Sequence, residues 1–179
     1  MFKEIFESTK VTIYHGDNHN TKEIKPTQMD KGNMQNGPGI YFSEDITVAK
    51  LYGKNIVQVE VDPKKFIPSR GPVSKMKLGY YMLKDLWKVD KEAMYYLISD
   101  WIEVHEPDDV TIDDVALLFS KMKQNEIRNF LITLSDSFGV EELVKVWMKH
   151  YPNKLGTYDK NTGFYSVINT NLKLKENNV

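Results

Sequence analysis

The 179-residue sequence contains no cysteine, so disulfide bridges, thiol nucleophiles and cysteine-ligated metal sites are excluded. Arginine is also scarce, since Arg70 and Arg128 are the only arginines among the 24 basic residues. The arginine fork is the side chain best suited to guanine and phosphate recognition. Its scarcity disfavours a sequence-specific DNA-binding protein, although the lysines still permit phosphate contacts.

The chain also lacks a charge excess and a long apolar run. Its formal net charge is −1, which gives no positive field to hold nucleic acid. No apolar stretch approaches the length of a membrane span, and the first ten residues lack the apolar core of a signal peptide. With 41% apolar and 27% charged residues, the composition is that of a globular protein. We expect a soluble cytoplasmic protein with no membrane partner, folded as a single domain over residues 1–179.

The first third of the chain has the pattern of short strands. β-branched and aromatic residues, or strict alternation, predict strands at 11–15, 40–42 and 55–61. A helix is expected after the second strand, with Ser43 as its N-cap and Gly53 as its stop. A polar, glycine-marked loop over 17–38 separates the first two strands. Loops of that length are uncommon in compact domains and are often functional.

The apolar period changes to that of helices from about residue 73 to residue 150, where we expect about five helices. Thr111 has the position of an N-cap in this block. Strands return in a predicted hairpin, with one strand ending at Asp159, a turn at 160–163 and the next strand beginning at Phe164. The order of strands, helical insertion and strands predicts an α+β fold.

His15 is the first candidate for a functional residue. A lone histidine at a strand end is more often structural, and tyrosines such as Tyr41 and Tyr52 are common in half-buried cores. Their combination is more informative. Gly16 directly after His15 lets a ligand approach the backbone closely. Tyr41 and Tyr52 are placed to form the walls of a slot for a flat heteroaromatic group.

The sequence resembles the ADP-ribosyltransferases of the histidine–tyrosine class, which include the poly-ADP-ribose polymerases and the diphtheria-toxin-like toxins. The resemblance covers residues 11–62 and 155–175 and leaves the helical block unmatched. It implies an ADP-ribosyltransferase-like split β-sheet core with a helical insertion, and NAD as co-substrate without a metal. Three motifs carry the resemblance: His15-Gly16, Gly39-x-Tyr41-Phe42-Ser43 and Ala49-x-x-Tyr52.

The resemblance also implies residue roles. His15 would hydrogen-bond the adenosine ribose of NAD, and Gly16 would bind the nicotinamide carboxamide through its backbone. Tyr41 would pack beside the nicotinamide ribose, and Tyr52 would stack on the nicotinamide ring. The loop over 17–38 would border the adenine and phosphate side. The implied NAD-binding set is His15, Gly16, Asp17, Tyr41, Phe42 and Tyr52.

The chain departs from the family pattern at three positions. Asp17 stands where a serine or threonine is usual, and Ala49 stands where a serine often helps to hold the carboxamide. Phe164 occupies the place of the catalytic glutamate, and the nearest carboxylate is that of Asp159. An anion there would stabilise the oxocarbenium character that develops when nicotinamide leaves ribose. The resemblance thus implies Asp159 and Tyr41 as the catalytic residues, with a plain turn aspartate as the alternative for Asp159.

The resemblance predicts an NAD-dependent mono-ADP-ribosyltransferase that modifies a protein. The layout is similar to that of small phage ADP-ribosyltransferases, including anti-CRISPR proteins, which suggests an effector acting in a host cytoplasm. The alternative is an NAD-binding or target-binding module without turnover. The helical block is expected to recognise the target or to act as a lid.

Two other enzyme classes are disfavoured. The arginine–serine–glutamate class of ADP-ribosyltransferases needs an arginine on the first strand, whereas the first arginine here is Arg70. The Glu60-x-Asp62 pair, which resembles its acidic motif, precedes the helical block. A metal hydrolase is disfavoured because no histidine and carboxylate pair has a recognisable ligand spacing. The histidines in question are His15, His19, His105 and His150.

Overall fold

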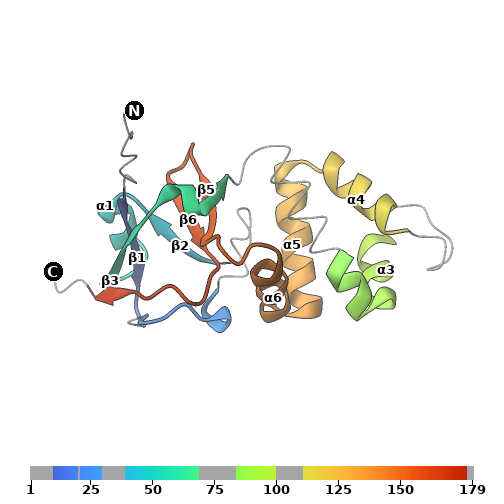
Figure 1. The fold of residues 1–179 in the computed structure, drawn as a ribbon, viewed down its shortest axis with the longest axis horizontal. Helices are drawn as coiled ribbons and strands as arrows, with labels where there is room; N and C mark the ends of the chain where they lie inside the picture. Colours follow the sequence, from blue (N-terminus) through green and yellow to red (C-terminus); the bar gives the residue numbers. More distant parts are fainter. Residues whose placement is uncertain (1–9, 20, 30–38, 69–83, 100–110, 177–179) are drawn as a thin grey trace, which may run out of the picture.

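The computed structural model describes residues 10–19, 21–29, 39–68, 84–99 and 111–176. The strands gather on one side of the molecule and most of the helices on the other (Figure 1). The predicted α+β class is therefore confirmed. In chain order the elements are β1 (Val11–Asp17), η1 (Pro26–Gln28), β2 (Ile40–Ser43), α1 (Ile46–Lys50), β3 (Asn55–Val61), η3 (Pro63–Lys65), β4 (Phe66–Pro68), α3 (Lys91–Ser99), α4 (Ile112–Lys121), α5 (Gln124–Phe138), α6 (Val140–His150), β5 (Gly156–Asp159), β6 (Phe164–Val167) and β7 (Lys175–Glu176).

The seven strands form one sheet in the order β4-β5-β6-β2-β1-β3-β7. β1 is paired with β3 along its whole length, and β2 is paired with β6 along its whole length. β1 and β2, by contrast, are paired only at Tyr14 and Ser43. The sheet is therefore almost divided between β2 and β1, which are joined at this one pair. Strands 11–17 and 164–167 nonetheless belong to one sheet, with β2 between them.

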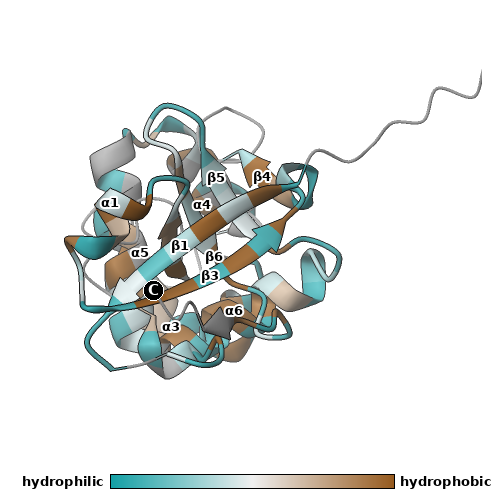
Figure 2. Ribbon diagram, turned by 90° about the vertical axis from the view of Figure 1, so that its left-hand side faces the viewer, coloured by the Kyte–Doolittle hydropathy of each residue, from teal (hydrophilic) through white to brown (hydrophobic). Residues whose placement is uncertain are grey.

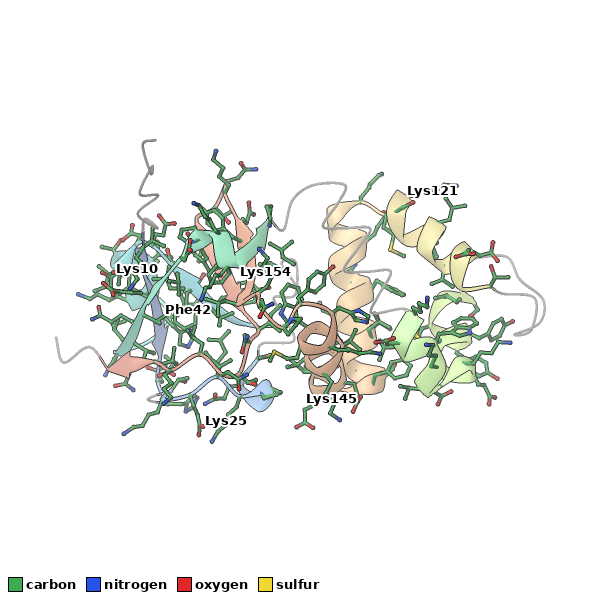
Figure 3. The ribbon with its side chains drawn as sticks, in the orientation of Figure 1. Lys10, Lys25, Phe42, Lys121, Lys145 and Lys154 are labelled. Carbon is green, nitrogen blue, oxygen red and sulfur yellow. The ribbon has the colours of Figure 1, made fainter. Side chains whose placement is uncertain are left out.

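The alternation of apolar residues along the strands places one face of the sheet in the core. Val57, Val59 and Val61 of β3 are buried together with Ile13 of β1, which lies opposite Val59. Hydrophobic bands along β1 and β3 are visible in Figure 2. Figure 3 shows Phe42 inside the sheet half of the molecule, and Lys25, Lys121 and Lys145 at the outer edge of the molecule. The burial of these apolar side chains is the main stabilising contribution of the sheet.

The helical block lies in sequence between β4 and β5. It comprises a helical segment at 84–89 followed by α3, α4, α5 and α6, and its buried side chains join those of the strands in one core. Thr111 caps α4 as predicted, because its hydroxyl accepts from the N–H of Asp114 while the Asp114 carboxylate accepts from Thr111. Among the described residues, no helix is long and apolar enough to cross a membrane.

α6 packs against η1, which belongs to the polar loop after β1. Ile24 and Met29, on either side of η1, are buried in the common core. The length of this loop therefore has a structural cause in addition to any ligand, since the loop reaches across to the helical block. Residues 30–38 of the loop lie outside the described part of the chain.

The predicted N-cap of α1 was wrong. Ser43 remains in β2, opposite Phe164, and the N-cap is Asp45, whose carboxylate accepts from the N–H of Thr47 at 2.7 Å. Strand pairing thus extends β2 by one residue and delays the helix. The helix also ends at Lys50, before Gly53. The hairpin of β5 and β6 is confirmed, whereas β4, which runs parallel to β5, was not anticipated.

Gly139 joins α5 to α6 with φ 81° and ψ 147°, a conformation that L-residues rarely adopt. We expect Gly139→Ala to lower the free energy of unfolding by about 1–3 kcal/mol, measured by denaturant unfolding. Ser137→Ala, an exposed change in the last turn of α5, should stay within about 0.5 kcal/mol of the parent. Equal effects of the two substitutions would contradict the strain at Gly139.

Candidate functional site

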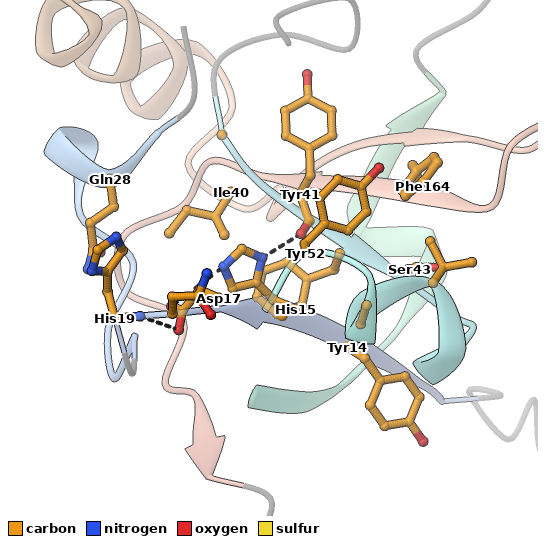
Figure 4. A pocket seen from close by; sticks show the side chains of 16 residues that line it. Tyr14, His15, Asp17, His19, Gln28, Ile40, Tyr41, Ser43, Tyr52 and Phe164 are labelled. Atoms are coloured by element: carbon orange, nitrogen blue, oxygen red, sulfur yellow. Dashed lines mark hydrogen bonds and ion pairs between the residues drawn. The ribbon is translucent and has the colours of Figure 1, made fainter. Parts of the chain in front are cut away.

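A cavity of about 430 Å³ opens where β1 and β2 part. Its walls come from the end of β1, the whole of β2 and the α1 helix, with further contributions from η1 and β6 (Figure 4). The lining residues are Tyr14, His15, Gly16, Asp17, Asn18, His19, Gln28, Gly39, Ile40, Tyr41, Phe42, Ser43, Val48, Ala49, Tyr52 and Phe164. All six residues expected to bind NAD are therefore brought to one cavity.

His15 bridges the gap between the two central strands. Its Nδ1 lies 2.8 Å from the carbonyl oxygen of Tyr41. Because a carbonyl only accepts, Nδ1 carries the proton, and Nε2 of the neutral ring is left as a hydrogen-bond acceptor. Burial lowers the pKa of His15 below its ordinary value, and this outweighs the opposing effects of the Tyr41 carbonyl and the Asp17 carboxylate. His15 is therefore neutral near pH 7.

Asp17 holds the start of the polar loop. One carboxylate oxygen accepts from the N–H of His19 at 3.0 Å, and the other accepts from the N–H of Thr21 at 3.0 Å and from the Thr21 hydroxyl. The same carboxylate lies 3.8 Å from Nε2 of His15. The carboxylate of Asp17, a residue expected to bind NAD, is thus already engaged in ordering the loop.

Gly16 is required by packing within the protein. A Cβ at this position would lie 1.9 Å from the carbonyl oxygen of Ala49 in α1, which is closer than Cβ atoms approach other atoms. The small residue therefore brings α1 against β1. This packing explains Gly16 without a ligand, and the main chain of Gly16 still lines the cavity.

Aromatic side chains gather at one end of the cavity. Figure 4 shows Tyr41, Tyr52 and Phe164 on one side of His15, and His19 and Gln28 on the other. Tyr52 is 61% exposed, so its ring is open to a ligand. The cavity therefore has an aromatic end and a polar end, with an imidazole between them.

Asp159 is not among the lining residues. It lies on β5 opposite Phe164, one strand further from the cavity, and is only 1% exposed. Its carboxylate accepts from the N–H of Asn161 at 3.0 Å, and its carbonyl accepts from the N–H of Gly163 at 2.9 Å. Asp159 thus has the contacts of a turn aspartate, and Phe164 takes the position at the cavity.

The placement of Phe164 is fixed by its neighbour. The Tyr165 hydroxyl donates to the Glu44 carboxylate at 2.5 Å, and Tyr165 packs in the core against Tyr158 with ring centroids 4.2 Å apart. Burial raises the pKa of Tyr165, and the Glu44 carboxylate raises it further. Because adjacent strand residues face opposite sides, an inward Tyr165 turns Phe164 to the other face.

The loop over 17–38 was expected to border the site, but the sequence did not single out Asn18, His19 and Gln28, which line the cavity. Gln28 reaches the site because α6 holds η1 in place. No local pattern marks this contact, and only the unusual length of the loop hinted at it.

The described residues contain no group of three or more histidine or acidic side chains that could hold a metal ion. Comparison of the chain with protein-family models, curated proteins and solved structures finds no match.

The lowered pKa of His15 predicts a pH dependence of stability. The unfolded chain binds a proton at this residue below pH about 6.5, whereas the folded protein resists it. The contribution of His15 is therefore present above its unfolded pKa and falls as the pH drops below it. His15→Asn keeps a donor for the Tyr41 carbonyl but does not titrate. Between pH 7.5 and 5.5 we expect the parent to lose more unfolding free energy than the variant. Identical pH profiles would contradict the burial of a neutral His15.

Proposed function

We propose that this cavity binds NAD and that the protein is an NAD-dependent mono-ADP-ribosyltransferase that modifies a protein acceptor. The observation that carries the proposal is the convergence of His15, Tyr41 and Tyr52 on one cavity at the parting of β1 and β2. Its volume of about 430 Å³ lies within the range of small-molecule and cofactor sites.

The aromatic end suits the nicotinamide ring. Tyr52 offers an exposed ring face for stacking, and Tyr41 lines the same cavity. The unprotonated Nε2 of His15 accepts a hydrogen bond, which suits a ribose hydroxyl. The exposed polar side chains of Asn18 and Gln28 face the remaining part of the dinucleotide.

In the proposed reaction the bond between the nicotinamide nitrogen and the ribose anomeric carbon breaks, and its electron pair leaves with nicotinamide. A nucleophile of the acceptor forms the new bond to the same carbon and loses its proton. Positive charge develops on the ribose during this exchange, and a nearby carboxylate stabilises it. Asp159 supplies that carboxylate only if the turn at 160–163 moves it toward the cavity by about one strand spacing, roughly 4.8 Å.

A second candidate function is an NAD-binding module without turnover. The observation in its favour is Phe164, an apolar side chain at the cavity where a carboxylate is needed, with Asp159 bonded within its own turn. Binding and turnover must therefore be measured separately, by calorimetric titration with NAD and by release of nicotinamide.

Tyr52→Ala should weaken NAD binding in either case. Loss of a stacked aromatic wall costs about 0.5–1.5 kcal/mol beyond the loss of buried area, or roughly two- to tenfold in Kd. The matched control is Leu51→Ala, because Leu51 is adjacent, 83% exposed and absent from the cavity lining. Titration calorimetry measures both. Unchanged affinity in Tyr52→Ala would place NAD elsewhere.

Asp159 and Phe164 distinguish the two functions. In a transferase that uses Asp159, Asp159→Asn lowers kcat by about 10²–10³-fold with little change in KM, because the lost charge acts mainly in the transition state. In a binding module the parent releases no nicotinamide, and Phe164→Glu, which places a carboxylate at the cavity, is expected to produce release.

Asn161→Ala serves as the control for the turn, since Asn161 is exposed and its main-chain N–H, which the substitution keeps, donates to the Asp159 carboxylate. Label from NAD that appears on a protein in a cell lysate, and that is weaker with Tyr52→Ala at NAD concentrations below Kd, supports transfer. An active parent whose kcat is unaffected by Asp159→Asn removes Asp159 from the mechanism.

A further inference from the structure

The end of β1 and the chain after α1 meet at a contact between two main chains. A Cβ added to Gly53 would lie 2.1 Å from both the carbonyl carbon and the carbonyl oxygen of Asp17. Such atoms do not approach within 3.0 Å, so an added methyl group must push the two segments apart. The obstacle is main chain, and no side-chain rotation can relieve it.

This contact joins the two walls of the cavity. Gly53 directly follows Tyr52, and Asp17 lies two residues after His15. A second link runs beside it, because the N–H of Lys54 donates to Oδ1 of Asn18 at 3.4 Å. On the far side, the Asp17 carboxylate is held by the loop residues His19 and Thr21. The Gly53–Asp17 contact is therefore supported by hydrogen bonds from both of the segments that form it.

The position of the Tyr52 ring depends on this contact. Tyr52 is 61% exposed, so core packing does not fix its side chain. Its main chain is held by the α1 turn, where its N–H donates to the Ala49 carbonyl at 3.0 Å, and by Gly53 against Asp17. A displacement of the chain at Gly53 therefore moves the ring relative to His15.

We propose that the Gly53–Asp17 contact sets the gap between Tyr52 and the opposite wall, so that Gly53 is the positioning residue that fits the cavity to a flat heteroaromatic ring. This inference rests on the proposed function, because it concerns the end of the same cavity that takes nicotinamide. Aromatic stacking depends on the offset and separation of the rings. A ligand without the ring does not depend on this gap.

The test compares NAD with ADP-ribose, which is the same ligand without nicotinamide. We titrate the parent and Gly53→Ala with each ligand by calorimetry and take the ratio of the two dissociation constants. The parent is expected to bind NAD more tightly than ADP-ribose. In Gly53→Ala the affinity for NAD should fall by about two- to tenfold, while the affinity for ADP-ribose stays constant.

Gly139→Ala is the control for lost stability, because Gly139 is strained but absent from the cavity lining, and it should leave the ratio unchanged. If Gly53→Ala does not fold, Asn18→Ala replaces it by removing the acceptor of the Lys54 N–H. If Asn18 contacts the ADP-ribose part that both ligands share, its loss weakens both ligands equally. The ratio of the two dissociation constants is then unaffected by that contact.

The outcomes separate this inference from the proposed function. Equal weakening of both ligands, or an unchanged ratio, overturns the role of Gly53 while leaving NAD binding intact. A parent that binds ADP-ribose and NAD equally well also overturns it, since the ring then makes no useful contact. A parent that binds neither ligand overturns the inference together with the proposed function.

Discussion

The cavity depends on one close contact, that of α1 and its following turn with the end of β1. Gly16 lies against Ala49 and Gly53 lies against Asp17, at distances that leave no room for a Cβ on either glycine. Two main chains in direct contact leave few arrangements open, because neither can yield by changing a rotamer. A short helix of five residues, and the turn after it that carries Tyr52, are thereby held against the sheet.

The parting of β1 from β2 is the second constraint. If β1 and β2 stayed paired, their main-chain hydrogen bonds would close the gap between them. Here the His15 imidazole donates to the Tyr41 carbonyl across that gap instead. This hydrogen bond gives the main-chain carbonyl of Tyr41 a partner, and it also fixes the tautomer of the His15 ring. The ring of His15 therefore has a structural role across the gap, and its Nε2 is the acceptor that the proposed NAD complex uses.

The helical block contributes to the cavity indirectly. α6 packs on η1, and η1 carries Gln28 to the polar end of the site. A second tie holds the block together, because the Asp85 carboxylate accepts from Lys149 at 2.7 Å and lies 2.9 Å from Nε2 of His150. Through the contact of α6 with η1, the helical block therefore touches one wall of the cavity.

The features that depend on neighbours along the chain could be predicted from the sequence. The strict alternation of β3, the cap at Thr111 and the β5–β6 hairpin were all predictable, since each follows from a local period or turn. The gathering of His15 and Tyr52 was also predicted, through a resemblance of motifs. Tertiary packing accounts for the placements that could not be predicted. It kept Ser43 in a strand, brought Gln28 to the cavity and withdrew Asp159 behind Phe164, because those placements depend on pairing and packing between segments far apart in sequence.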